Sequence, residues 1–242
     1  MTKPRYRFEY KYFIAAHTAA ILRARAQAVM RPDAHHGGTY TVHNLYLDDR
    51  YDSFYYARYL GRLCRDKYRL RFYNGNMDFI RLERKHKDGI RSYKDTTPVT
   101  REQYQRIRDG DLAFLLEENM DQAIWHDLGV IYRLRGLRPT TSFAYRREAY
   151  TYLAGDVRIT FDSPPFDPDP GKADRPVMPP CYDPLGHNHG RMDYHPLLLE
   201  VKFSGFLPEV IKRLLDGLPL QHTSMSKYCL VRERGLLPYG KT

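Results

Sequence analysis

Four cationic side chains alternate with other residues in the segment 65–71, which reads RDKYRLR. They are Arg65, Lys67, Arg69 and Arg71. Successive side chains of a β-strand point to opposite faces of the sheet, so a strand here would carry all four on one face. Arginine suits phosphate, because its guanidinium grips two oxygens and keeps its charge when desolvated. A solvated strand face shows the same alternation, so this segment alone leaves both readings open.

Other segments repeat this division into a charged and an apolar face. The charged faces carry Arg5, Arg7, Glu9 and Lys11; Arg81, Glu83, Lys85 and Lys87; Arg158, Thr160 and Asp162; and Glu200 and Lys202. Like charges opposite one another destabilise a sheet, and two cations ~4 Å apart repel by roughly 4 kcal/mol at an effective dielectric of about 20. The set therefore predicts charged faces turned onto a shared cavity that an anion fills, with the apolar faces outward beneath helices.

Strands are the elements expected to position these residues. We expect them at 5–13, 39–49, 65–73, 79–87, 142–150, 156–162 and 197–203. The turn signal NGN at 74–76 predicts a hairpin, and a second turn at Asp88-Gly89 precedes a short strand. Seven or eight strands with interspersed helices indicate an α+β fold around a mainly antiparallel sheet.

Four helices are expected between the strands. The first spans 17–30 and begins near Thr18, and the second begins at a capping box of Thr100 and Gln103 and runs to about Asn119. The other two fall within 121–134, where Trp125 is assigned to helix packing, and within 207–217.

The stretch 163–196 is rich in Pro, Gly, His and Asp and is expected to be an irregular insertion in a single domain, 1–242. Its GHNHG run at 186–190 and the pair His35-His36 have no carboxylate or cysteine at ligand spacing, so these histidines are expected at the surface rather than on a metal.

The composition predicts a globular protein with anionic partners. Lys and Arg number 39 against 29 Asp and Glu, a formal net charge of +10, and 42% apolar residues argue against disorder. Three scattered cysteines favour a reduced compartment. With no stretch near ~18 apolar residues and no signal-like N-terminus, we expect a cytoplasmic protein without a membrane span.

An ordered series of motifs resembles a known family. The series is RFEYKYFI, YTVHNLYLDD, YLGRLCRDKYRLRFY, IRLERKHK with Lys94 downstream, YRREAY, RITFD, LLLEVKFSGFLPEVI and SMSKY. It resembles the VTC domain, the polyphosphate polymerase branch of the triphosphate tunnel superfamily, which also includes the CYTH proteins, and it covers nearly the whole chain. The resemblance implies an eight-stranded antiparallel β-barrel tunnel with a basic lumen and helices packed outside.

The resemblance also assigns site residues by motif. Phosphate binding falls to Lys11, Arg69, Arg71, Lys85, Lys94, Arg147, Arg158, Ser226 and Lys227, and the catalytic set would be Lys11, Arg69, Arg71, Lys85 and Glu200. A divalent metal, Mn²⁺ or Mg²⁺, would bind Glu200, with Glu9 as a weaker second ligand. Of the adjacent arginines, Arg147 fits the pattern Y-x-R-x-A and Arg146 does not.

One position departs from the wider superfamily. Its hydrolases and cyclases typically begin with E-x-E-x-K, whereas this chain has Arg7-x-Glu9-x-Lys11. The change removes a carboxylate that could hold a second metal ion or activate water, and so makes hydrolysis a less favoured main activity. Glu9 and Glu83 either add outer ligands to the metal or pair with neighbouring cations.

The expected activity is transfer of the ATP γ-phosphoryl group to a growing polyphosphate chain, with ATP and polyphosphate or pyrophosphate as partners. Two alternatives share the fold: a tripolyphosphatase or nucleoside triphosphatase, and a non-catalytic polyphosphate or nucleotide sensor. Nucleic-acid binding is disfavoured, because its basic stripe would lie on the exterior, whereas these cations are spread over many strands and mixed with Glu9, Glu83 and Glu200. The oligomeric state stays open.

Overall fold

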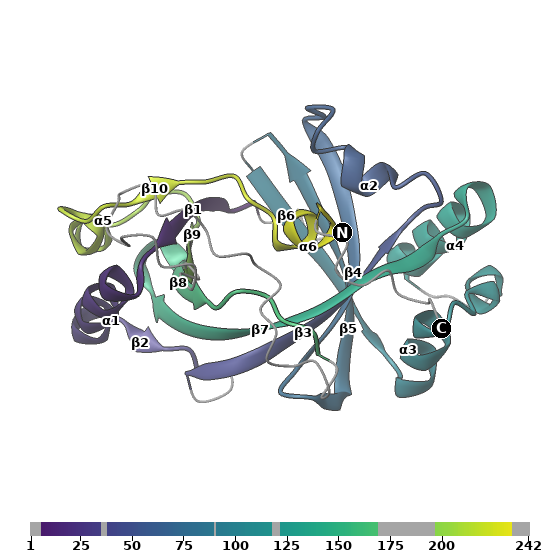
Figure 1. Ribbon diagram of the computed structural model, residues 1–242, viewed down its shortest axis with the longest axis horizontal. Coiled ribbons are helices and arrows are strands. Elements are labelled where there is room, and N and C mark those ends of the chain that lie inside the picture. The colour runs from purple at the N-terminus through teal and green to yellow at the C-terminus, as the bar shows by residue number, and fades with distance from the viewer. Residues whose placement is uncertain (1–5, 35–37, 90, 118–121, 169–196, 234–242) are drawn as a thin grey trace. The chain divides into compact units, whose positions relative to one another are not determined.

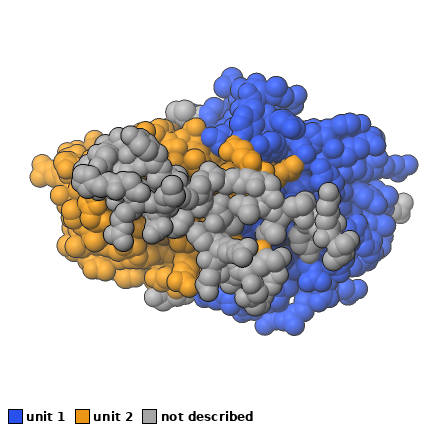
Figure 2. Space-filling model, in the orientation of Figure 1, with its two compact units in different colours: residues 1–6, 42–143, 235–242 blue, residues 7–41, 144–234 orange. Residues whose placement is uncertain are grey.

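The computed structural model describes residues 6–34, 38–89, 91–117, 122–168 and 197–233. The chain forms two compact units, which Figure 2 shows in different colours. Unit 1 comprises residues 1–6, 42–143 and 235–242, and unit 2 comprises residues 7–41 and 144–234. Each unit has its own hydrophobic core.

Within the described residues, an antiparallel sheet of ten strands is the main element of the fold (Figure 1). The strands are β1 (Phe8–Ile14), β2 (Arg31–Pro32), β3 (Thr39–Asp48), β4 (Cys64–Tyr73), β5 (Asn76–Asp88), β6 (Arg91–Val99), β7 (Arg138–Tyr152), β8 (Val157–Asp162), β9 (Leu197–Phe203) and β10 (Gln221–His222). Their order is β10-β1-β9-β8-β7-β3-β4-β5-β6, and β2 pairs with β7. The long strands β3 and β7 contribute residues to both units.

The predicted α+β class and its antiparallel sheet are confirmed, but the strand number differs from the eight expected. Two of the ten strands, β2 and β10, have only two residues each. A segment that short has no alternation for a sequence pattern to reveal. The segment after Asp88-Gly89, expected as a short strand, is the nine-residue β6.

Six α-helices and two 3₁₀ helices accompany the strands in the described residues. They are α1 (Ala16–Val29), α2 (Ser53–Tyr56), α3 (Arg101–Arg108), α4 (Ala123–Arg135), α5 (Glu209–Leu215), α6 (Lys227–Glu233), η1 (Ala113–Leu116) and η2 (Ala154–Asp156). Among the residues that the structure describes, every helix is too short or too polar to cross a membrane.

In unit 1, β4 and β5 form the predicted hairpin. Asn74 and Gly75 connect the strands with φ angles of 51° and 70°, a left-handed conformation that favours these two residue types. The apolar faces of both strands, including Leu70 and Leu82, pack against Ile107 of α3 and against α4. Trp125 of α4 is buried in this core, as expected.

In unit 2, the apolar faces of β8 and β9 pack beneath α1 and α5. Val201 and Ile159 belong to one buried cluster with Leu22 of α1 and Ile211 of α5. The prediction that the apolar strand faces lie beneath helices is therefore confirmed within each unit.

Two helix boundaries were predicted wrongly. The capping box of Thr100 and Gln103 is present, but α3 ends at Arg108 rather than near Asn119. Gly110 follows with a φ of 84°, which breaks the helical path before η1 begins. Helix α1 begins at Ala16, so Thr18 lies buried inside the helix instead of capping it.

Of the expected irregular insertion, the structure describes residues 163–168. Within this part, Phe166 forms an isolated β-bridge with Ala144. The remainder of the insertion, together with the GHNHG run and the His35-His36 pair, lies outside the described residues.

The contact between α4 and η1 depends on a glycine. A Cβ atom added at Gly129 would lie 2.5 Å from the backbone oxygen of Leu115. We therefore expect Gly129→Ala to lower the free energy of unfolding by about 1–3 kcal/mol through overpacking, although alanine favours a helix by about 1 kcal/mol over glycine. Urea unfolding measures the change.

Val130→Ala, at the next and exposed position of α4, is the matched control and should change stability by less than about 0.5 kcal/mol. If Gly129→Ala were as stable as the parent protein, the close packing of α4 on η1 would be wrong.

Candidate functional site

The buried carboxylate of Glu83 organises a cation cluster in unit 1. Glu83 lies on β5 directly opposite Arg69 of β4, and its Oε2 accepts a hydrogen bond from Arg69 Nε at 2.8 Å. Lys94 Nζ of β6 lies 2.7 Å from Oε1, and Arg71 Nη1 lies 3.7 Å from Oε2. Three cations from two strands therefore share one carboxylate whose side chain is only 1% exposed.

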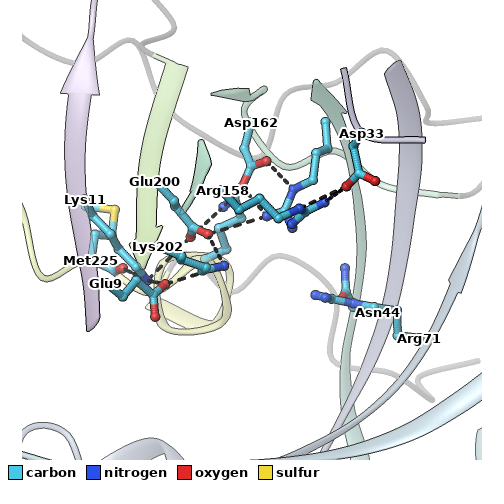
Figure 3. Close-up of polar contacts among 12 residues, drawn as sticks. Glu9, Lys11, Asp33, Asn44, Arg71, Arg158, Asp162, Glu200, Lys202 and Met225 are labelled. Atoms are coloured by element: carbon cyan, nitrogen blue, oxygen red, sulfur yellow. Dashed lines mark hydrogen bonds and ion pairs between the residues drawn. The ribbon is translucent and has the colours of Figure 1, made fainter. Parts of the chain in front are cut away.

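Neutral acceptors on β3 hold the arginines of this unit 1 cluster in place. Asn44 Oδ1 accepts from Arg71 Nε at 3.0 Å and Nη2 at 2.7 Å, a pair drawn in Figure 3. Arg69 Nη1 donates to the Tyr46 hydroxyl at 2.8 Å. Burial alone would raise the pKa of Tyr46, but the charges of Arg69 and Arg71 lower it below its usual value.

Lys85 belongs to a row of lysines across three neighbouring strands. It lies directly opposite Lys67 of β4 on one side and Lys94 of β6 on the other. Cations at directly opposite positions repel each other. The carboxylate of Glu83, two residues before Lys85 on β5, lies 2.7 Å from one of them, Lys94. The row gives this face of unit 1 an excess of positive charge.

Unit 2 contains a second cluster, around Glu200 of β9. Lys202 Nζ lies 2.8 Å from Glu200 Oε2. Three further cations each lie 3.6 Å from one of its oxygens: Lys11 and Lys227 from Oε1, and Arg147 from Oε2. Glu200 is buried, so its charge is balanced almost entirely by these side chains.

Asp162 of β8 is a second buried carboxylate in the same cluster. It forms a bidentate pair with Arg147, with Nε 2.6 Å from Oδ1 and Nη2 2.7 Å from Oδ2. Lys227, the first residue of α6, also donates to Oδ2. The Tyr145 ring lies beneath both cations, 5.2 Å from Arg147 Cζ and 4.6 Å from Lys227 Nζ.

Arg158 is fixed separately within unit 2. Its Nη2 donates to Asp33 Oδ2 at 2.7 Å and to the Tyr40 hydroxyl at 2.6 Å, and Figure 3 shows it directed at Asp33. Ser226, the weaker phosphate-contact candidate, is half-buried directly before α6.

Burial and the neighbouring positive charges shift the pKa of the buried carboxylates in opposite directions. Burial alone would raise the pKa of Glu200, but Lys202, Lys227 and Lys11 hold it well below its usual value. Arg69, Arg71 and Lys94 likewise overcome burial and hold the pKa of Glu83 well below its usual value. Both side chains are therefore ionised at neutral pH, and each serves as a counter-ion to several cations.

Two carboxylates converge where the sequence predicts a metal. Glu9 Oε1 lies 3.3 Å from Lys11 Nζ and 3.9 Å from Lys202 Nζ, the same two ammonium groups that approach Glu200. Within the described part of the chain, no group of three or more His, Cys, Asp or Glu side chains is arranged to hold a metal. Mg²⁺ is commonly held by one or two carboxylates together with substrate phosphates. Glu200 and Glu9 fit a metal held in that way, rather than one enclosed by protein ligands.

The structure brings most of the predicted residues together within their own units. In unit 1 these are Arg69, Arg71, Lys85 and Lys94; in unit 2 they are Glu9, Lys11, Arg147, Glu200 and Lys227. Arg147 is buried beside Asp162 and Arg146 is exposed, and the assignment of phosphate binding to Arg147 stays a prediction.

Sequence reasoning did not assign several residues that hold the cations. The alternation placed Asp162 and Lys202 on charged strand faces, but it gave neither residue a role at the site. Asn44 and Tyr46 also alternate along β3. Asp33 lies outside the strands and gave no pattern that would have found it.

The fold and the two clusters define an α+β protein with a large antiparallel sheet whose charged faces gather cations around buried carboxylates. The model of one family, described as the VTC domain, matches residues 6–233. The chain belongs to the VTC-domain family, and the resemblance found in the sequence is confirmed.

Among solved structures, a putative adenylyl cyclase from Hippeastrum, described as having a dominant triphosphatase activity, shares the fold. It aligns with a TM-score of 0.58 at 16% identity over 97% of this chain and 98% of that chain. A protein from Pyrococcus horikoshii (12% identity, 94% and 99% coverage) and a putative adenylate cyclase from Bacillus halodurans (10% identity, 100% and 96% coverage) align more distantly, each with a TM-score of 0.48. No curated protein matches the chain.

The Glu83 cluster has a direct consequence for stability. Glu83→Gln leaves Arg69 and Lys94 without their buried counter-ion, so we expect the free energy of unfolding at pH 7 to fall by about 3–5 kcal/mol. The pKa of Glu83 is depressed by folding, so its stabilisation is present above the ordinary glutamate pKa and is lost as the pH falls through the folded value. The unfolding free energy of the parent protein should therefore drop steeply below about pH 5, and more gradually in the variant.

Urea unfolding at several pH values between neutral and strongly acidic tests both the loss of stability at pH 7 and the pH dependence. Glu209→Gln, at an exposed position of α5, is the control and should leave the pH profile unchanged. If the unfolding free energy fell with pH as steeply in Glu83→Gln as in the parent protein, the role of Glu83 as a buried counter-ion would be wrong.

Proposed function

We propose that this VTC-domain protein transfers the γ-phosphoryl group of ATP to the end of an inorganic polyphosphate chain. The proposal rests on the family, on the cations at the positions where the resemblance expects phosphate contacts, and on the state of the carboxylates among them. The tunnel, a cytoplasmic location and the absence of nucleic-acid binding remain predictions.

The single observation that carries the proposal is that Glu83, Asp162 and Glu200 are paired with cations that lower the pKa of each carboxylate. The pKa values of Glu83 and Glu200 are held well below their usual value and that of Asp162 is also lowered, against burial, by neighbouring cations. A general base that activates water works best with a pKa near the operating pH, so these three are poor bases. The terminal phosphate of a polyphosphate chain has a second pKa of about 6, so its oxygen is largely anionic at neutral pH and needs no base.

The chemistry then consists mainly of positioning and charge neutralisation. A terminal oxygen of the acceptor attacks the γ-phosphorus, a new P–O bond forms, and the bond from the γ-phosphorus to the β–γ bridging oxygen breaks, so that ADP leaves and the chain grows by one phosphate. Each unit has a buried arginine that would bind phosphate oxygens through its guanidinium donors: Arg71, oriented by Asn44, in unit 1, and Arg147, oriented by Asp162, in unit 2. Lys11, Lys94 and Lys227 would add positive charge.

A divalent metal ion, Mn²⁺ or Mg²⁺, would be held by Glu200 with Glu9 and would neutralise charge on the phosphates of the bound nucleotide. Hydrolysis of a triphosphate is the rival activity, and the Hippeastrum protein of similar fold is described as having it. A sensor that binds phosphate chains without turnover is the other rival.

Incubation of the pure protein with γ-labelled ATP and Mn²⁺ or Mg²⁺, followed by sizing of the labelled product, tests the proposal. Long labelled chains are the expected product. Labelled orthophosphate alone would identify a hydrolase, and tight binding of polyphosphate with no turnover under either metal would identify a sensor. Either of those results would overturn the polymerase assignment.

The arginine pair at the start of YRREAY offers a matched test of phosphate binding. Arg147→Lys keeps the positive charge beside Asp162 but loses the planar guanidinium, so we expect kcat/KM for ATP to fall by about 10- to 100-fold, the worth of one charged hydrogen bond. Steady-state kinetics measure the change, and urea unfolding checks that both variants are folded.

Arg146→Lys changes the adjacent, exposed residue in the same way and should leave kcat/KM unchanged. Equal effects of the two substitutions, or none from either, would exclude Arg147 from the substrate site.

A further inference from the structure

Lys202 occupies a distinctive place beside Glu200. The two residues are two positions apart on β9, so they share a strand face, and Lys202 Nζ donates to Glu200 Oε2 at 2.8 Å. Its contact is the shortest of the four cations around Glu200, since Lys11, Lys227 and Arg147 each lie 3.6 Å away. The same ammonium group lies 3.9 Å from Glu9 Oε1. It therefore lies near both carboxylates that would bind a metal.

We propose that the Lys202 ammonium group takes the place of a divalent metal on Glu200 in the phosphate-free protein, so that the metal binds tightly only together with a phosphate chain. The role in substrate loading rests on the proposed function, whereas the competition between lysine and metal for Glu200 does not.

Position and exposure distinguish Lys202 among the four cations. Arg147 and Lys227 are both held by the buried carboxylate of Asp162. Lys11 also donates to the backbone oxygen of Met225 at 3.2 Å (Figure 3). The Lys202 side chain is 22% exposed, and a lysine ammonium group is strongly hydrated on a flexible stem. It is the most exposed of the four, against 19% for Lys11, 11% for Lys227 and 6% for Arg147.

Charge also explains why binding of the metal depends on binding of phosphate. A divalent ion placed on Glu200 in the phosphate-free protein meets four nearby positive charges, which oppose its binding. A phosphate chain brings negative charge, supplies oxygen ligands to the metal, and gives Lys202 a new anionic partner. Metal and phosphate therefore each favour the binding of the other, and this mutual dependence is a coupling free energy between two ligands.

Titration of the full chain with Mn²⁺ alone, without nucleotide or phosphate, tests the proposal. Electron paramagnetic resonance of free Mn²⁺ gives the Kd. Lys202→Met removes the competing charge and should tighten Mn²⁺ binding at least tenfold. Lys202→Arg retains a cation and should bind Mn²⁺ as weakly as the parent protein, as should Lys212→Met, which alters an exposed lysine of α5.

The double variant Glu200→Gln with Lys202→Met tests whether the tighter Mn²⁺ binding depends on Glu200. It should bind Mn²⁺ no more tightly than the parent protein, because the ligand is gone. Unchanged or weaker Mn²⁺ binding in Lys202→Met, or tight binding that persists in the double variant, would overturn the proposal. The readout needs no turnover, so a protein that fails to make polyphosphate can still pass this test, and a polymerase can still fail it.

Discussion

The pairing of buried carboxylates with clustered cations is the interaction on which both units depend. A sheet face carrying only arginine and lysine would be destabilised by repulsion between neighbouring strands. Glu83 in unit 1 and the pair Asp162 and Glu200 in unit 2 relieve that repulsion from within the cluster. The sequence suggested that an external anion would be needed to hold these cations together, and the structure shows that the chain supplies much of the balancing charge itself.

This arrangement has a chemical consequence. A carboxylate held ionised by several cations is a counter-ion rather than a base, and a cation oriented by a carboxylate or amide is already placed for a phosphate oxygen to bind. Arg71 on Asn44 and Arg147 on Asp162 are the clearest cases, since both arginines are buried and held at two donor atoms. Under the proposed function, an incoming phosphate chain would bind to positions that are largely set in advance, and little side-chain freedom would be lost at that step.

The alternation of charged and apolar residues predicted the strand faces well because the period of a strand is two and one face of each strand is buried. It placed Arg69 and Glu83 on the charged faces of their strands and Leu70 and Leu82 on the apolar faces, which pack in the core. Other features lay beyond this pattern. Two-residue strands have no period, the end of α3 depends on backbone conformation at Gly110, and Asp33 reaches Arg158 across 125 residues of sequence. Contacts of that kind depend on tertiary structure, and a single sequence does not display them.

A crystal structure with tripolyphosphate bound would test the central claim most directly. The account predicts phosphate oxygens within hydrogen-bonding distance of the buried arginine of a cluster, Arg71 in unit 1 or Arg147 in unit 2, with Glu83 and Asp162 still paired to their cations. Phosphate bound only at exposed surface lysines, with both clusters unchanged and without contact to it, would contradict the account.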